Sequence, residues 1–185
     1  REWLDKGEAW AQHMMASWYR QGRCGVKQSY VMAAMLFEKA VAQGDPAAMR
    51  DLALLYEDGR GVEQSFQKAA ELYTMAVEQG HVDAMFNLGN MYRNGEGVAQ
   101  SFQKSAELYT MAAEEEHVGA MFNLALLYED GQGVVQSFQK AVELYTMAAE
   151  QGKVDAMSNL GVLYFQGQGV DQSNELAREW LTKAA

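Results

Sequence analysis

Apolar and polar positions recur along the chain with the period of an α-helix, and the predicted helices come in pairs. Between residues 83 and 94, one face of a 3.6-residue wheel collects apolar or small residues and the other collects polar ones. The apolar face holds Ala84, Met85, Leu88, Gly89 and Tyr92, and the polar face holds Asp83, Asn87, Asn90, Arg93 and Asn94. Residues 102–114 show the same division. The pattern predicts a helix, a turn and a second antiparallel helix, and strand patterning is absent.

A Gly-x-Gly-Val turn separates the two helices of each pair and returns at one constant spacing. Its first glycine is Gly59, Gly95, Gly131 or Gly167 in successive copies. Glycine suits a helix C-terminus because it adopts left-handed dihedral angles without a Cβ clash. Serines such as Ser101 follow the turn and are good N-caps. The spacing predicts repeats at 8–44, 45–80, 81–116 and 117–152, with a shorter last one at 153–185.

The two ends of the chain carry a related sequence. Residues 1–4 read REWL, and residues 178–181 read REWL again. We therefore interpret residues 1–7 as the end of a preceding repeat, and we expect the chain to be part of a longer array. Stacked repeats contact mainly their neighbours, so we predict a single elongated repeat domain over residues 1–185.

Charge and composition narrow the classes of partner. Fifteen basic and 25 acidic residues give a net charge of −10. A nucleic-acid binder needs a basic face, and an anionic membrane surface attracts basic proteins, so neither fits. We predict another protein or a peptide as partner, with a basic one favoured. No apolar run approaches a membrane span, and no secretory leader is visible. A removed leader would permit a periplasmic or secretory-pathway location, and the cytoplasm is equally open.

Residues that carry chemistry are few. Cys24 is the only cysteine, so an intrachain disulfide is excluded. His81 and His117 occupy equivalent positions one repeat apart, and we expect them to be solvated between repeats. The pairs Glu57-Asp58 and Glu129-Asp130 are predicted to be solvated helix ends rather than acid/base pairs. We predict no catalytic residue, no metal and no cofactor.

The repeat unit resembles a known family. The third copy presents Ala84, Leu88, Gly89, Tyr92, Gly95, Gly97 and Val98, then Lys104, Ala106, Leu108, Tyr109, Ala112 and Ala113. This pattern is similar to that of the Sel1-like repeats, which are relatives of the tetratricopeptide repeats. The resemblance implies an all-α fold, a right-handed superhelical α-solenoid of antiparallel helix-turn-helix repeats. It does not extend to the cysteine-rich branch of the family, which places a cysteine pair in every repeat.

Two ladders of equivalent residues are candidates for a binding site. In this class the first helices line the concave side, so Asn87, Asn123 and Asn159 would face a groove, with Asp51 at the same position of the second copy. Their amides could grip a peptide backbone, or they could bond a neighbouring helix. Phe86 and Phe122 lie on the polar side of the wheel and could anchor a ligand side chain. The candidate binding residues are Asp51, Asp83, Phe86, Asn87, Asn90, Arg93, Phe122, Asn123, Asp155 and Asn159, the aspartates attracting basic groups.

The resemblance implies an adaptor, because Sel1-like proteins serve as adaptors in membrane-associated assemblies, endoplasmic-reticulum degradation and bacterial signalling. We therefore predict a non-catalytic scaffold that holds a peptide or protein surface, and we expect a monomer. One alternative is an inhibitor or immunity-type protein that blocks a specific enzyme. A second alternative is a structural spacer without a groove ligand. A hydrolase would need a nucleophile–base pair, which this pattern does not provide.

Overall fold

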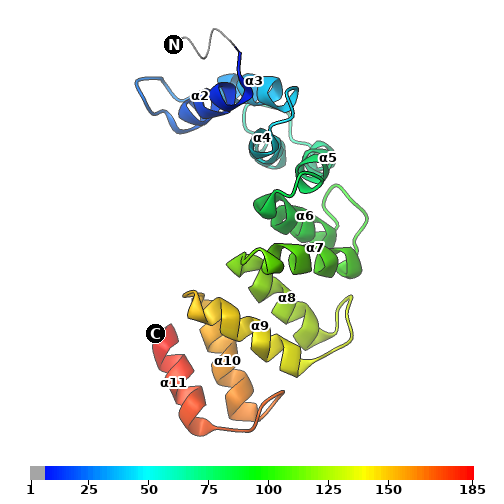
Figure 1. The fold of residues 1–185 in the computed structure, drawn as a ribbon, viewed down its shortest axis with the longest axis vertical. Helices are drawn as coiled ribbons and strands as arrows, with labels where there is room; N and C mark the ends of the chain where they lie inside the picture. The colour runs from blue at the N-terminus through cyan, green and yellow to red at the C-terminus, as the bar shows by residue number, and fades with distance from the viewer. Residues whose placement is uncertain (1–6) are drawn as a thin grey trace. The chain divides into compact units, whose positions relative to one another are not determined.

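A computed structural model describes residues 7–185 (Figure 1). Over these residues all regular secondary structure is helical, in ten helices. They are α2 (Ala9–Gln21), α3 (Tyr30–Val41), α4 (Pro46–Asp58), α5 (Phe66–Val77), α6 (Val82–Asn94), α7 (Phe102–Glu114), α8 (Val118–Asp130), α9 (Phe138–Glu150), α10 (Val154–Gln166) and α11 (Asn174–Ala184). None of these helices is long and apolar enough to cross a membrane. Our interpretation of residues 1–7 as part of a preceding repeat falls almost entirely on residues 1–6, which lie outside the described residues.

The chain divides into two compact units. The first ends at Gln100 and contains α2 to α6, and the second begins at Ser101 and contains α7 to α11. Within each unit every helix packs on the next one in sequence. Even-numbered helices are the first helices of the repeats and odd-numbered helices are the second helices. In Figure 1 the hairpins α2–α3 and α4–α5, and likewise α8–α9 and α10–α11, can be followed by colour.

Serine starts each of the five second helices. The side chain of Ser101 accepts a hydrogen bond from the backbone N–H of Lys104, and Ser137 accepts one from Lys140. Ser29, Ser65 and Ser173 cap α3, α5 and α11 in the same way. The N-cap role predicted for this serine is thus confirmed, and it explains where each second helix begins.

Three of the first helices, α4, α6 and α8, have side-chain caps that the sequence did not reveal. His81 and His117 are N-caps, because their Nδ1 atoms accept hydrogen bonds from the N–H groups of Ala84 (3.3 Å) and Ala120 (3.1 Å). Our expectation that these histidines are simply solvated was wrong, since half-buried rings satisfy helix donors that would otherwise lack a partner. In α4 the cap is Asp45, which accepts from the N–H groups of Ala47 and Ala48.

The second glycine of each turn lies against the backbone that begins the preceding second helix. A Cβ atom on Gly97 would lie 2.2 Å from the carbonyl oxygen of Phe66, and one on Gly133 would lie 2.2 Å from the carbonyl carbon of Phe102. Both glycines also have positive φ angles, of 70° and 71°. This glycine is therefore required twice, for its dihedral angles and for its lack of a side chain.

Each of four second helices buries one aromatic ring completely. The ring belongs to Phe37 in α3, Tyr73 in α5, Tyr109 in α7 and Tyr145 in α9, and all four residues are fully buried. Alanines fill most of the remaining core and allow the helices to approach closely. Because three of these rings carry a hydroxyl group, each of those positions needs a polar partner in the core.

We predict that Gly133→Ala destabilises the protein far more than Gly152→Ala. Both glycines have positive φ, but a Cβ on Gly152 would meet no atom within 4 Å. Gly152→Ala, the control, should therefore lower the free energy of unfolding only by the strain of an alanine with positive φ, about 1–2 kcal/mol. Gly133→Ala should add about 1–3 kcal/mol from overpacking against the backbone of Phe102. Urea unfolding followed by circular dichroism checks this difference, and equal losses for the two variants would contradict the contact.

Candidate functional site

A tyrosine hydroxyl links the second helix of one repeat to the first helix of the next. Tyr73 in α5 donates a hydrogen bond to the carboxylate of Glu57 in α4, and its oxygen is also bonded by the Asn87 side chain of α6. Burial raises the pKa of Tyr73, and the bond to Glu57 raises it further. Burial raises the pKa of Glu57 as well. The hydroxyl therefore keeps its proton and acts as a donor.

The second unit repeats this arrangement. The Tyr145 hydroxyl of α9 donates to Glu129 of α8 at 2.7 Å and is bonded by the Asn159 side chain of α10. Burial and the bond to Glu129 raise the pKa of Tyr145. Asn123 of α8 donates to the Tyr109 hydroxyl of α7 at 3.3 Å.

The asparagine ladder therefore bonds the neighbouring second helix, one of the two alternatives we drew from the sequence. Glu57 and Glu129 were expected to be solvated helix ends. That expectation was wrong, because each is half-buried and accepts a hydrogen bond from a tyrosine.

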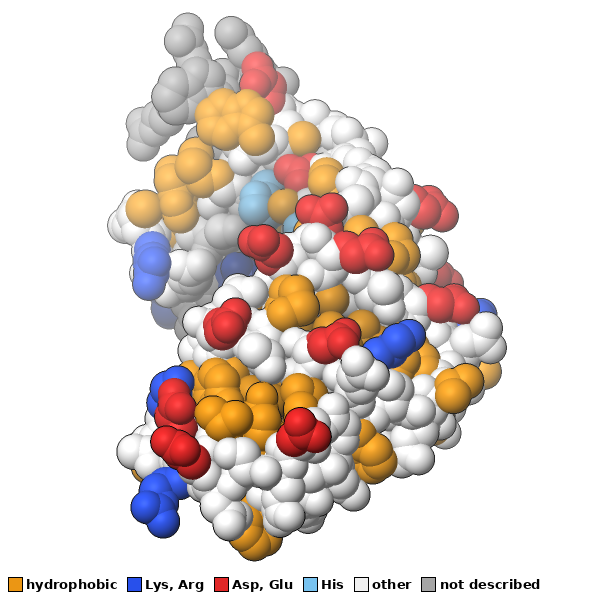
Figure 2. Space-filling view, turned by 60° about the horizontal axis from the view of Figure 1, so that its bottom comes forward, with side chains coloured by type: hydrophobic (Ala, Val, Ile, Leu, Met, Phe, Trp, Pro, Cys, Tyr) orange, Lys and Arg blue, Asp and Glu red, His pale blue; other side chains and the backbone are white. Residues whose placement is uncertain are grey.

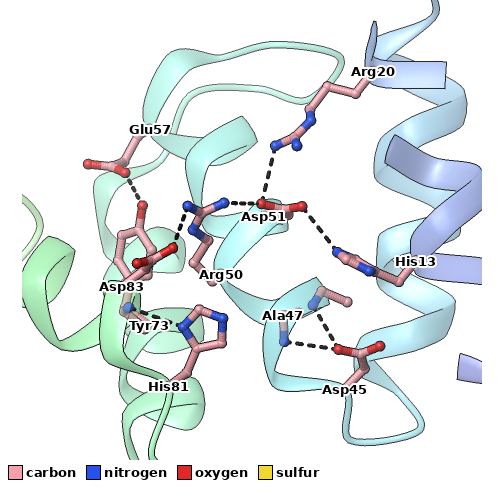
Figure 3. A network of polar contacts seen from close by, with 12 residues as sticks. His13, Arg20, Asp45, Ala47, Arg50, Asp51, Glu57, Tyr73, His81 and Asp83 are labelled. Atoms are coloured by element: carbon pink, nitrogen blue, oxygen red, sulfur yellow. Dashed lines mark hydrogen bonds and ion pairs between the residues drawn. The ribbon is translucent and has the colours of Figure 1, made fainter. Parts of the chain in front are cut away.

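At the contact between the first and second repeats, which we call the first junction, an ion pair takes the place of the hydrogen bonds made by a tyrosine hydroxyl. Phe37 stands where the later repeats have tyrosine, and Asp51 stands where they have asparagine. Arg20, at the position of Glu57, reaches across the Phe37 ring, its Cζ lying 5.9 Å from the ring centroid. It then pairs with Asp51, Nη1 to Oδ1 at 3.2 Å. Figure 3 shows this ion pair beside the Tyr73–Glu57 hydrogen bond.

Asp51 is the centre of a wider network. Its side chain is 6% exposed and lies 3.1 Å from the Nε2 of His13 and 2.5 Å from the Nη1 of Arg50. The Nη2 of Arg50 in turn contacts Oδ2 of Asp83 at 2.7 Å. Burial alone would raise the pKa of Asp51, but the hydrogen bond from His13 and the charges of Arg20 and Arg50 outweigh it, and the pKa is lowered. The carboxylate is therefore ionised and held from three sides.

This network has the features of a structural ion cluster. A general base must reach substrate, whereas Asp51 is enclosed by side chains from α2 and α4. Among the described residues, no group of three His, Cys, Asp or Glu side chains could hold a metal ion. Cys24 is exposed in the turn between α2 and α3, with a positive φ of 56°.

The remaining candidate residues lie on first helices but do not form one cluster. Asp83 pairs with Arg50, and Asp155 pairs with Lys153 at 2.6 Å. Phe122 is half-buried, with its ring centroid 5.7 Å from that of Tyr145 and the Lys153 ammonium 5.1 Å above it. Phe86, Asn90 and Arg93 are half-buried along α6.

The sequence prediction missed His13, Arg20 and Arg50. A signal was present, because two substitutions at the first junction occur together when the copies are aligned. Where tyrosine becomes Phe37, asparagine becomes Asp51. The position of Arg20 changes independently, because the third copy has Arg93 there and is followed by Tyr109 and Asn123. Phe37 and Asp51, which change together, are linked through Arg20, which interacts with both.

Comparison with known proteins agrees with the fold. A model of the Sel1 repeat matches residues 11–45, 46–81, 82–117, 118–153 and 154–185. The chain belongs to the Sel1 repeat family. The family resemblance drawn from the sequence is thereby confirmed, as is the all-α solenoid of helix-turn-helix repeats. A comparison with curated proteins found no match.

Solved structures of other Sel1 repeat proteins are similar. A protective antigen of uropathogenic Escherichia coli strains, which displays this repeat fold, is 27% identical with a TM-score of 0.94, over 97% of this chain and 38% of that one. A Sel1 repeat protein from Oxalobacter formigenes is 29% identical with a TM-score of 0.90, over 96% of this chain and 70% of that one. A putative Sel1 repeat protein from Klebsiella pneumoniae is 25% identical with a TM-score of 0.63, over 100% and 89% of the two chains.

We predict that Asp51→Asn lowers stability at neutral pH and flattens its dependence on acid. Because the pKa of Asp51 is lower in the folded state, its contribution is present above the unfolded value of about 3.9 and is lost as pH falls through the folded value. The loss at pH 7 should be about 1–3 kcal/mol, since the arginines left without this partner are partly exposed. Urea unfolding at several pH values between 3 and 7 measures it.

The control for this series is Asp58→Asn, at an exposed carboxylate of the same helix. It should keep the acid dependence of the unaltered protein. An Asp51→Asn profile parallel to that of the control would contradict the role of the network.

We also predict that Tyr145→Phe lowers the free energy of unfolding by about 1–3 kcal/mol, because Glu129 and Asn159 each lose a buried hydrogen-bond partner. The fold should persist, since Phe37 occupies the same position in α3. Tyr128→Phe is the control, because it keeps the ring over which Lys140 lies. Thermal unfolding of the two variants gives the comparison, and an unchanged midpoint for Tyr145→Phe would show that the hydroxyl does not join the repeats.

Proposed function

We propose that the chain is a non-catalytic scaffold that binds a protein or peptide through the side chains of its first helices. The observation that carries this proposal is the variation along one first-helix position. That position is Arg50 in α4, Phe86 in α6, Phe122 in α8 and Ser158 in α10, and all four are half-buried. A row that changes from cation to ring to hydroxyl presents a different chemistry at each repeat and can match the irregular surface of one partner.

The polar groups between the repeats support a scaffold role. Asp51, Asn87, Asn123 and Asn159 bond to other parts of the chain, so in this proposal they hold the repeats rather than the ligand. The candidate binding residues are then fewer than in the sequence prediction: Phe86, Asn90 and Arg93 with Asp83 on α6 of the first unit, and Phe122 on α8 and Asp155 on α10 of the second. Phe86 and Phe122 would serve as apolar anchors.

The surface is also suited to a basic partner. The net charge of −10 would steer a basic protein towards it. Figure 2 shows acidic side chains spread among hydrophobic patches on the face it presents.

The test is affinity capture from a lysate of the organism that makes the protein, with the intact chain and with a Phe86→Ala, Asn90→Ala double variant. We expect one discrete partner that the variant loses by at least tenfold. Val135→Ala is the matched control, because it removes apolar surface from a loop residue that is 89% exposed. Circular dichroism must show equal helicity for all three proteins.

Hydrogen exchange on the captured complex then locates the partner. Protection of α6 and α8 would support the first-helix surface. A partner that the double variant retains in full would refute it.

A further inference from the structure

The exposed faces of three second helices are identical. Every exposed position of α5 carries the residue found at the equivalent position of α7 and α9. In α5 these residues are Gln67, Lys68, Glu71, Thr74 and Met75. The three helices differ at only three positions, Ala69/Ser105/Ala141, Ala70/Ala106/Val142 and Val77/Ala113/Ala149, and eight of these nine residues are buried.

This is the reverse of the usual pattern. Surface substitutions usually change stability by less than about 0.5 kcal/mol, so exposed residues are free to vary while buried ones are constrained. The first helices of the same repeats vary at buried positions, such as those of Ala53 and Leu55, and also at positions nearer the surface. In α4, α6 and α8 the positions of Ala47, Arg50, Leu54, Glu57 and Asp58 all vary, and none of these is fully buried. Both helices of a repeat were duplicated together, so duplication alone does not preserve only one outer face.

Helix propensity can account for the preserved glutamine, lysine, glutamate and methionine, but it does not account for the preserved threonine. Threonine is a poor helix former, and its hydroxyl here only bonds the carbonyl four residues earlier, at 2.8 Å from Thr74 to Ala70. Met75, Met111 and Met147 are 42%, 42% and 46% exposed. Methionine adapts its shape to a partner and is common on binding surfaces. The repeated exposed threonine and methionine together are therefore better explained by contact with another molecule.

A small hollow accompanies the preserved face in each unit. In the first unit, Leu52 and Tyr56 of α4 and Lys68, Leu72 and Met75 of α5 line a concavity of about 230 Å³, with Glu71 at its rim. In the second unit, five equivalent residues line one of about 220 Å³ between α8 and α9: Leu124, Tyr128, Lys140, Glu143 and Leu144, with Thr110 as the sixth in place of the methionine. Each hollow is of the size that accepts one large apolar side chain.

The charged residues around each hollow indicate which type of residue would lie next to the apolar side chain of a ligand. The Lys68 ammonium lies 5.1 Å from the centre of the Tyr56 ring, and Lys140 lies 4.9 Å from that of Tyr128. The lysines are thus engaged by rings of their own chain. The exposed glutamates Glu71 and Glu143 are left to attract a cation from a partner.

We propose that the hollows at Tyr56 and Tyr128 each bind the same kind of short peptide segment, one in each unit. An apolar side chain of the segment enters the hollow, and an adjacent arginine or lysine pairs with Glu71 or Glu143. The proposal rests on the proposed function only in taking a polypeptide as ligand, and it uses a different surface. Identical sites suit a partner that presents one motif twice, whereas the variable first helices suit an irregular surface.

The experiment is a peptide titration of the 185-residue chain, followed by NMR of ¹³C-methyl-labelled methionines and of backbone amides. The probe is an acetylated octapeptide with one leucine flanked on each side by an arginine. We expect saturable shifts of the Met75 and Met147 methyl signals. Matched peptides with serine for leucine, or with glutamates for arginines, should bind at least tenfold more weakly.

The two sites act as controls for each other. Glu71→Gln should weaken the response of Met75 about fivefold, the effect of about 1 kcal/mol for one ion pair, and leave that of Met147 unchanged. Glu143→Gln should do the opposite.

Absence of shifts at both methionines up to the solubility limit of the peptide would overturn the proposal, as would equal binding of the serine peptide. Shifts confined to amides of the first helices would also overturn it while leaving the proposed function intact.

Discussion

Neighbouring repeats meet backbone against backbone where a glycine turn lies on the first residue of the preceding second helix. Gly97 and Gly133 leave no room for even a methyl group at this contact. Because the backbones meet there, the helices beyond must pack at a short distance, which favours the alanines that fill the core. Besides the buried leucines and methionines of the first helices, each of four second helices places one fully buried aromatic ring in this core.

That ring determines the polar chemistry of the interface. A tyrosine brings a hydroxyl into a dry layer, and the layer then needs an acceptor and a donor, which Glu129 and Asn159 provide at Tyr145. A phenylalanine removes the hydroxyl, and the space is crossed by Arg20 to reach Asp51. The two solutions fit the same backbone but share no hydrogen-bonding group.

The fold could be predicted from the sequence almost completely, because the information that specifies it is local and repeated. The glycine spacing, the serine caps and the helical periodicity each act within a few residues, and each occurs in several copies. The polar contacts were harder to predict because they join residues far apart in sequence. The sequence left two roles open for Asn123, binding a ligand or bonding a neighbouring helix. The second is the one seen, because Asn123 donates to the hydroxyl of Tyr109 in the preceding helix. Glu57 looked like a solvated helix end for the same reason, since its partner Tyr73 belongs to the next helix.

The first junction also restricts how such an array can change its length during evolution. Nearly identical copies recombine easily, and recombination removes or adds whole repeats. Loss of a repeat within the later part of the chain again places a tyrosine before an asparagine, so the interface is restored. Loss of the second repeat would place Phe37 before Asn87, which deprives Arg20 of its carboxylate and the amide of its hydroxyl. A change of length that keeps the first two repeats together retains this interface, whereas one that separates them does not.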